Sequence, residues 1–345
     1  MPGILTIPLS WMYRFGVAVR HMLFDRHVLP SFQVAVPTIC VGNLAVGGTG
    51  KTPMTEYLLR LLVANGYHLA VLSRGYKRAT RGFRMADAFS TVETIGDEAM
   101  QVHRKFPDVP VAVCENRVRG VRQLKRMVEN LDVVVLDDAM QHRAIRCGFT
   151  ILLTPYDHLY IDDHMLPWGT LRDLPSRALK ADAVVVTKCP DTIRPIDMRV
   201  VDNRLHLPTY QQLHFAGIDY APMEQEGNPL VLCGIAQPQY MLDYVKQKYP
   251  HADLMAFPDH HHYQPKDIEA ILTRARHYDF VLTTEKDIQR LRTTPLVERL
   301  REQNKRLIAL PIQMSFRSPA EAFNRQILQY VRENIPHTSP LHPAV

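Results

Sequence analysis

The sequence predicts an α/β protein with a doubly wound parallel sheet and a second, smaller α/β domain. Short apolar runs alternate with helical segments up to about residue 187, and these runs lack the polar–apolar alternation of half-exposed strands. Strands of this kind are buried on both faces, which is typical of a parallel sheet covered by helices on either side. A second series of strands and helices begins near residue 229, and 345 residues are enough for two domains.

The expected strands of the first series are bounded by turn residues and rich in valine, isoleucine and leucine. They cover residues 34–41, 69–73, 110–114, 131–137, 149–154 and 183–187. The second series is expected to have strands over residues 230–234, 254–258, 280–284 and 307–310, with helices over 238–248, 265–277 and 319–333.

The domain boundaries follow from a change of pattern after residue 200. Residues 210–216 alternate between polar and apolar side chains, and residues 223–229 are polar with glycine and proline. We therefore expect a first domain over residues 1–200, a linker with short antiparallel strands over 201–228 and a smaller α/β domain over 229–345.

A glycine-rich loop lies between the first expected strand and a helix on which Met54, Leu58 and Leu62 recur at helical spacing. Its glycines allow successive backbone N–H groups to turn toward phosphate oxygens, and the helix N-terminus adds its positive dipole end. The predicted nucleotide-binding residues are Ala45, Val46, Gly47, Gly48, Thr49, Gly50, Lys51 and Thr52.

Two side chains at the end of this loop have expected roles in binding a nucleoside triphosphate. Lys51 is placed to reach the β and γ phosphates, and the Thr52 hydroxyl to coordinate Mg²⁺. The usual motif has a glycine where this chain has Ala45. The alternative is a turn that merely joins a strand to a helix, but the strand-to-helix context favours a P-loop NTPase-like fold.

Two carboxylates, Asp137 and Asp138, end the apolar run over residues 131–136. A buried strand that ends beside a phosphate loop can deliver an acid to Mg²⁺ or to its water shell. Acids also cap strand ends in turns, so this role depends on the pairing with the loop.

Asp97 and a run of histidines are open to two interpretations each. Asp97 lies in an expected first helical turn, where acids are favoured by the dipole, or it faces the nucleotide as a general base. By position alone, the first interpretation is preferred. Adjacent residues on an extended chain point in opposite directions, so His260, His261 and His262 are not expected to bind one ion. A histidine at the cleft between the domains could act in acid–base chemistry, or the run could be a solvated loop.

The net charge of +6 indicates an anionic partner: nucleic acid, an acidic membrane or a phosphorylated substrate. No aromatic-and-basic repeat supports nucleic acid, which we do not expect as a partner. Residues 4–20 are apolar but interrupted by Arg14 and Arg20, which argues against a transmembrane helix. This segment is either an amphipathic helix at a membrane interface or a helix packed on the core, and the segment alone slightly favours packing on the core.

Together, these motifs resemble those of the tetraacyldisaccharide 4'-kinase family of the lipid A pathway in Gram-negative bacteria. The matching segments appear in the family's order: 42–44 with 47–53, 73–76, 96–98, 137–138 with 141–142, 257–260 and 284–287. The family's loop also lacks the glycine that Ala45 replaces. This chain departs from the family in having Ala99 where proline is expected. It also has an extra histidine, which leaves open whether His260 or His261 is functional. We favour His260, which follows Asp259 directly.

The resemblance implies transfer of the γ-phosphate of ATP to the 4'-hydroxyl of an acylated glucosamine disaccharide 1-phosphate, giving the bis-phosphorylated lipid A precursor. It implies three catalytic residues: Asp97 as the base, His260 to orient it or share its proton, and Lys51 to neutralise the phosphates. Thr52, Asp137 and Asp138 would serve Mg²⁺.

A substrate with four acyl chains stays in the bilayer, so the resemblance also favours residues 4–20 as an interfacial helix. The protein would then be peripheral, at the cytoplasmic face of the inner membrane. The competing interpretation is a P-loop ATPase or GTPase of the partitioning or metallochaperone type. Those proteins commonly have a second lysine near the start of the loop, where this chain has Ala45 and Val46.

Overall fold

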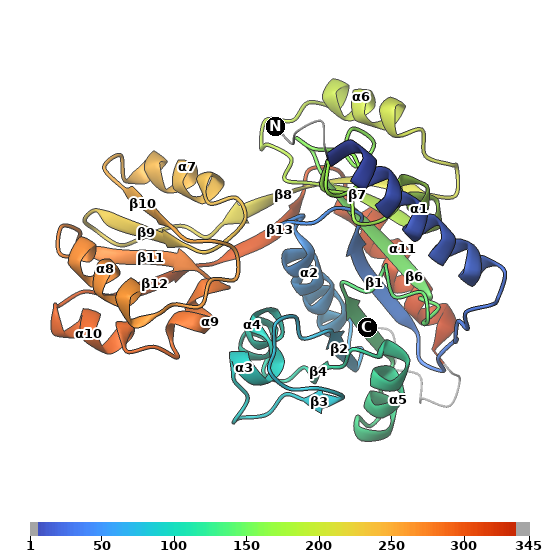
Figure 1. Ribbon diagram of the computed structural model, residues 1–345, viewed down its shortest axis with the longest axis horizontal. Helices are drawn as coiled ribbons and strands as arrows, with labels where there is room; N and C mark the ends of the chain where they lie inside the picture. The colour runs from blue at the N-terminus through green and yellow to red at the C-terminus, as the bar shows by residue number, and fades with distance from the viewer. Residues whose placement is uncertain (1–5, 336–345) are drawn as a thin grey trace.

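The computed structural model describes residues 6–335, whose strands form two sheets (Figure 1). The strands of the larger sheet are β1 (Thr38–Asn43), β2 (Leu69–Ser73), β3 (Arg84–Met85), β4 (Val111–Val113), β5 (Val133–Asp137), β6 (Phe149–Pro155), β7 (Ala183–Thr187), β8 (Gln212–Tyr220) and β13 (Ile312–Phe316). They lie in the order β13-β8-β7-β6-β1-β5-β2-β4-β3. Every pair from β4 to β8 is parallel, which confirms the predicted sheet, and β3 and β13 add antiparallel edges.

Helices cover both faces of the larger sheet. They are α1 (Thr6–Asp25), α2 (Lys51–Ala64), α3 (Val92–Ile95), α4 (Asp97–Lys105), α5 (Arg117–Met127), α6 (Pro195–Leu205) and α11 (Ala320–Asn334), with a 3₁₀ turn at Pro175–Lys180. On β1, Ile39 and Val41 face the core shared with α2, α4 and α11, whereas Cys40 faces the core shared with α5. Helices therefore bury the side chains on both faces of this strand, as in a doubly wound sheet.

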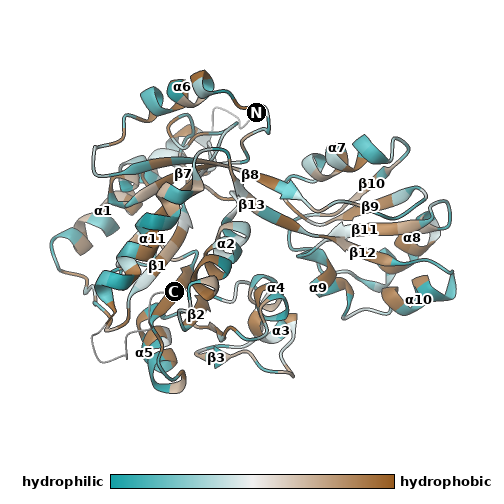
Figure 2. Ribbon diagram, turned by 180° about the vertical axis from the view of Figure 1, so that it is seen from behind, coloured by the Kyte–Doolittle hydropathy of each residue, from teal (hydrophilic) through white to brown (hydrophobic). Residues whose placement is uncertain are grey.

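The smaller sheet is also parallel, with the order β10-β9-β11-β12. Its strands are β9 (Pro229–Cys233), β10 (Asp253–Ala256), β11 (Phe280–Thr284) and β12 (Leu307–Leu310), and its helices are α7 (Gln239–Lys248), α8 (Pro265–Ala275), α9 (Asp287–Leu291) and α10 (Leu296–Glu302). α7 packs on one face, and α8 and α10 pack on the other. The hydropathy colouring shows brown strands inside both sheets, with teal and brown alternating along the outer helices (Figure 2).

The connection between the sheets differs from the predicted linker. β8 is one strand, parallel to β7 on one side and antiparallel to β13 on the other, and not a local antiparallel pair. β13 and α11 belong with the larger sheet, because Phe323, Ile327 and Val331 bury the apolar face of α11 in its core. The amphipathic pattern of a helix predicts that one face is buried but not which sheet covers it. The sequence alone therefore assigned these residues to the smaller domain, whose other segments precede them directly along the chain.

Candidate active site

The glycine-rich loop runs from the end of β1 to the start of α2, at the edge where the parallel strands end. Gly50, the residue before α2, has φ 90°, a conformation that side chains with a Cβ rarely adopt. The backbone N–H of Val46 donates to the Thr170 carbonyl at 2.8 Å, and the Thr187 hydroxyl donates to the Thr49 carbonyl at 2.8 Å. Within residues 6–335 no side chain caps α2, so its first N–H groups are available to an anion.

Lys51 extends from this loop toward a polar cluster that contains Asp138. Its Nζ lies 3.4 Å from Asn43 Oδ1 and 4.0 Å from Asp138 Oδ1. Arg172 donates to both oxygens of Asp138 and to Asn43. Burial raises the pKa of Asp138, but the charges of Lys51 and Arg172 and the Arg172 hydrogen bonds outweigh it and lower this pKa to about 2. Asp138 is therefore a carboxylate already paired with two cations.

Asp137, the last residue of β5, has the opposite environment. Its Oδ1 is buried and has no hydrogen-bond partner within the described part of the chain. Burial and the nearby charges of Glu98 and Asp138 raise the pKa of Asp137 to about 7. Of the two predicted metal ligands, Asp138 is thus paired with two cations, whereas the buried Oδ1 of Asp137 has no hydrogen-bond partner among the described residues. Among the residues described, no group of three or more histidine, cysteine or acidic side chains is arranged to hold a metal.

Asp97 and His260 meet across the two sheets, although 163 positions separate them. Asp97 is the first residue of α4, and His260 follows β10 in the smaller sheet. His260 Nδ1 lies 2.8 Å from Asp97 Oδ2, and both side chains are largely buried. Burial raises the pKa of Asp97, but the hydrogen bond from His260 and the charges of Lys286 and Arg290 outweigh it, so this pKa lies below its ordinary value.

The structure places the other candidate histidine elsewhere. His261 Nε2 lies 2.9 Å from Asp267 Oδ2, and its ring stacks on Phe257 with centroids 4.8 Å apart. Of the two histidines that the sequence left open, His260 is therefore the one at Asp97.

Several polar residues at the site had no predicted role. Asn43 and Arg172 contact Lys51 or Asp138, and Arg290 Nη1 lies 3.5 Å from Asp97 Oδ2. Lys286 and Arg290 come from the segment after β11, at the end of another parallel strand. Polar residues at strand ends were the available signal, because such ends gather at one edge of a sheet. Arg172 lies on an irregular loop, and its position could not be inferred this way.

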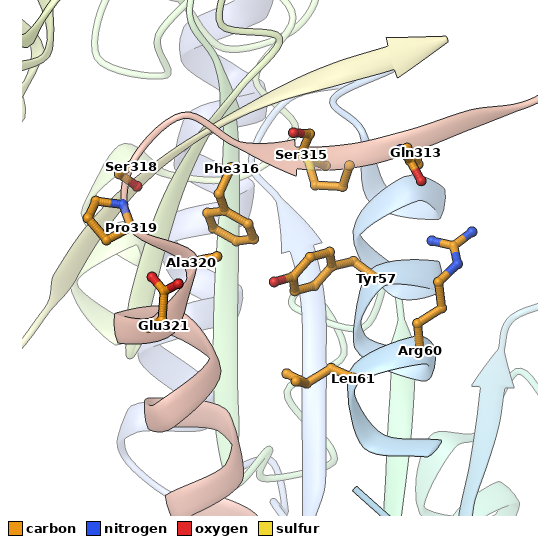
Figure 3. Close-up of a pocket in the computed structure, with 11 residues that line it drawn as sticks. Tyr57, Arg60, Leu61, Gln313, Ser315, Phe316, Ser318, Pro319, Ala320 and Glu321 are labelled. Carbon is orange, nitrogen blue, oxygen red and sulfur yellow. The ribbon is translucent and has the colours of Figure 1, made fainter. Parts of the chain in front are cut away.

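The two clusters adjoin through Glu98, which follows Asp97 and whose charge acts on Asp137. A cavity of about 150 Å³ lies beside Asp97 and His260, lined also by Tyr76, Gly96 and Arg290. A larger hollow of about 640 Å³ lies between α2, β13 and the start of α11, where Tyr57 faces Phe316 and Glu321 (Figure 3). None of the predicted site residues lines this larger hollow.

Similarity to known proteins extends over almost the whole chain. The crystal structure of the "apo" form LpxK from Aquifex aeolicus in complex with ATP has the same fold, with a TM-score of 0.72 and 24% identity, covering 94% of this chain and 98% of that chain. A tetraacyldisaccharide 4'-kinase of Bacteroides thetaiotaomicron is 43% identical over 96% of this chain and 94% of its own length. One of Flavobacterium johnsoniae is 42% identical over 96% and 98%. The family model for tetraacyldisaccharide-1-P 4'-kinase matches residues 3–332. The chain therefore belongs to the tetraacyldisaccharide-1-P 4'-kinase family.

Proposed function

We propose that the protein transfers the γ-phosphate of ATP to the 4'-hydroxyl of a tetraacyldisaccharide 1-phosphate. Family membership supports this reaction, and the curated relatives that cover the chain carry the kinase name. The observation that carries the proposal is a buried carboxylate, Asp97, 2.8 Å from an imidazole. The next residue, Glu98, acts by its charge on Asp137, as does Lys51 of the phosphate-binding loop. The rival interpretation, a nucleotide hydrolase of the partitioning or metallochaperone type, is not favoured.

In the proposed reaction, the acceptor hydroxyl loses its proton to a carboxylate oxygen of Asp97. The hydroxyl oxygen forms a bond to the γ-phosphorus as the bond from that phosphorus to the bridging oxygen breaks, and ADP leaves with the electron pair. Lys51 and the N–H groups at the start of α2 stabilise the charge on the phosphate oxygens. Despite burial, the pKa of Asp97 is lowered by His260, Lys286 and Arg290, so at neutral pH the side chain is the carboxylate that this step requires.

Transfer of label from γ-labelled ATP to tetraacyldisaccharide 1-phosphate in detergent micelles tests the proposal. We expect a labelled lipid product that depends on both substrates. Release of labelled phosphate without labelled lipid, by protein that binds ATP, would instead identify a hydrolase.

The carboxylates at the end of β5 fit a magnesium ion bound together with ATP. The unpaired, buried Oδ1 of Asp137 is costly without a partner, and carboxylate and hydroxyl oxygens are the ligands that Mg²⁺ prefers. Asp137 and Thr52 would hold the ion, with Asp138 beside it. The ion would neutralise charge on the β and γ phosphates.

Mg²⁺ is expected to stabilise the nucleotide-bound protein through Asp137. With a non-hydrolysable ATP analogue present, saturating Mg²⁺ should raise the free energy of unfolding by about 1–3 kcal/mol. Asp137→Asn should lose most of this increase, whereas Asp108→Asn, which changes an exposed acid in the turn after α4, should retain it. Thermal unfolding measures the difference, and an equal response of both variants would exclude Asp137 as a ligand.

We further propose that α1 attaches the protein to the cytoplasmic face of the inner membrane. From residue 6 to residue 335, no helix is long and apolar enough to cross a bilayer. One side of α1 is docked, since Ser10 donates to the Met165 carbonyl and His21 pairs with Asp173. The other side exposes Trp11 (72%) and Phe15 (71%), with Leu9 and Met12 beside them. The predicted segment began at Ile4, which lies outside the described residues.

Replacing Trp11 and Phe15 together by serine is expected to weaken binding to phosphatidylglycerol-containing vesicles by about 10- to 100-fold, because two aromatic side chains no longer enter the interface. Binding of ATP should not change. Phe89→Ser is the matched control, since Phe89 is 88% exposed at a different surface. Vesicle co-sedimentation measures the effect, and equal sedimentation of the double variant and wild type would contradict attachment through α1.

A further inference from the structure

Lys286 lies on the side of His260 that faces away from Asp97. Its Nζ is 3.0 Å from His260 Nε2, whereas His260 Nδ1 is 2.8 Å from Asp97 Oδ2. The turn that carries Lys286 is fixed by Asp287, which accepts hydrogen bonds from the Thr284 hydroxyl at 2.7 Å and from Gly234 N–H at 2.9 Å. Both nitrogens of the imidazole are therefore held, each by a residue in a defined position.

The chemistry of the lysine decides which nitrogen carries the imidazole proton. An ammonium group has three donors and no acceptor, so a hydrogen bond between Lys286 and His260 requires Nε2 to accept. The proton of the neutral ring must then be on Nδ1, from which it is donated to Asp97. Two carboxylates hold the ammonium in place: Asp259 Oδ1 at 3.3 Å and Glu98 Oε1 at 3.9 Å.

We propose that Lys286 is a positioning residue that fixes His260 as the Nδ1–H tautomer, so that His260 orients Asp97 without taking up its proton. This inference rests on the proposed function, because the proton in question is the one that the acceptor hydroxyl gives up. The acceptor hydroxyl would give its proton to Asp97, and this proton would not pass on to the imidazole. His260 has no free nitrogen for it, because Nδ1 already carries hydrogen and Nε2 is occupied by Lys286.

The remaining neighbours of His260 are consistent with this assignment. Arg290 reaches Asp97 from α9 and cannot accept a proton, and Tyr76 contacts the His260 ring edge with centroids 5.2 Å apart. Asp259 Oδ2 is 3.8 Å from Nε2, beyond hydrogen-bond distance. His262 lines the same cavity. Among these described neighbours, Lys286 alone makes a hydrogen bond to Nε2.

The tautomer can be read directly from long-range ¹H–¹⁵N spectra of protein with labelled histidine, with the His260 signals assigned by their loss in His260→Gln. We expect the Nδ1–H form of His260 in the wild type. Lys286→Met, which keeps the length of the side chain, should admit the Nε2–H form. Lys246→Met, an exposed lysine on α7 of the same sheet, should leave the His260 signals unchanged.

Steady-state kinetics on the same proteins give the functional readout. Lys286→Met is expected to lower kcat for transfer by about 10- to 100-fold through misorientation of the base, with little change in KM for ATP. An Nε2–H or doubly protonated His260 in the wild type would overturn the proposal before any variant is made. An unchanged tautomer in Lys286→Met, with KM for ATP raised, would also overturn it and make Lys286 a nucleotide ligand. The spectra need no kinase activity, so they test the role of Lys286 even if the proposed transfer reaction is not observed.

Discussion

Asp97→Asn is expected to lower the rate of phosphate transfer by about 10²- to 10⁴-fold, the usual contribution of a general base. The asparagine keeps the size of the side chain and can still accept a hydrogen bond from His260, but it cannot take up a proton. Binding of ATP should be retained, because the phosphate loop is built from other residues. The measurement pairs the lipid transfer assay with equilibrium binding of ATP, and Asp108→Asn serves as the control for loss of an acid. Full activity of the asparagine variant would exclude Asp97 as the base.

The pH dependence of the same reaction adds a second check on Asp97. In the wild type its pKa lies below the ordinary value of 3.8, so loss of activity through its protonation is confined to lower pH. His260→Ala removes the hydrogen bond that lowers this pKa, whereas burial, which raises it, remains. The acid limb of kcat/KM is therefore expected to move to higher pH in His260→Ala, and a limb that moves to lower pH would contradict the assignment.

Lys51→Met is expected to reduce transfer by about 10²- to 10³-fold, comparable to the removal of a donor that stabilises developing negative charge. It should also weaken ATP binding, because methionine keeps the apolar stem but removes the charge that meets the phosphates. Lys246→Met is the control for loss of a positive charge far from the loop. Isothermal calorimetry with a non-hydrolysable analogue and the transfer assay separate the two effects. Unchanged binding and turnover would show that Lys51 does not contact the nucleotide.

The parts of the site that follow from local rules were predictable from the sequence. Lys51 ends a glycine-rich loop between a strand and a helix, and Asp137 ends an apolar strand, so both are placed by covalent neighbours and by the parallel sheet. By position alone, Asp97 was better explained as an acid at a helix N-terminus than as a general base. Its partner His260 comes from the other sheet, and such a contact depends on tertiary packing.

Two further features, the position of Arg172 and the packing of α11, were not predicted for the same physical reason. Arg172 reaches Asp138 from a loop without periodic pattern, and α11 returns to the larger sheet after the chain has completed the smaller one. Apolar spacing determines that a helix has a buried face, but the surface that covers this face is chosen by packing across the whole molecule.

The paired strands β8 and β13 determine how the smaller sheet can move. The chain crosses between the sheets twice, and the two crossings are hydrogen-bonded to each other from Tyr220–Ile312 to Ala216–Phe316 (Figure 1). Because the two crossings are joined into one ribbon, a movement of the smaller sheet would have to bend or twist both strands together. Away from this ribbon, further contacts join the sheets. Lys105 Nζ on α4 lies 2.7 Å from Glu285 Oε1, and His260 lies against Asp97. If the smaller sheet moved away, Asp97 would lose its contact with His260, so we expect the proposed base to be assembled only when the two sheets lie together.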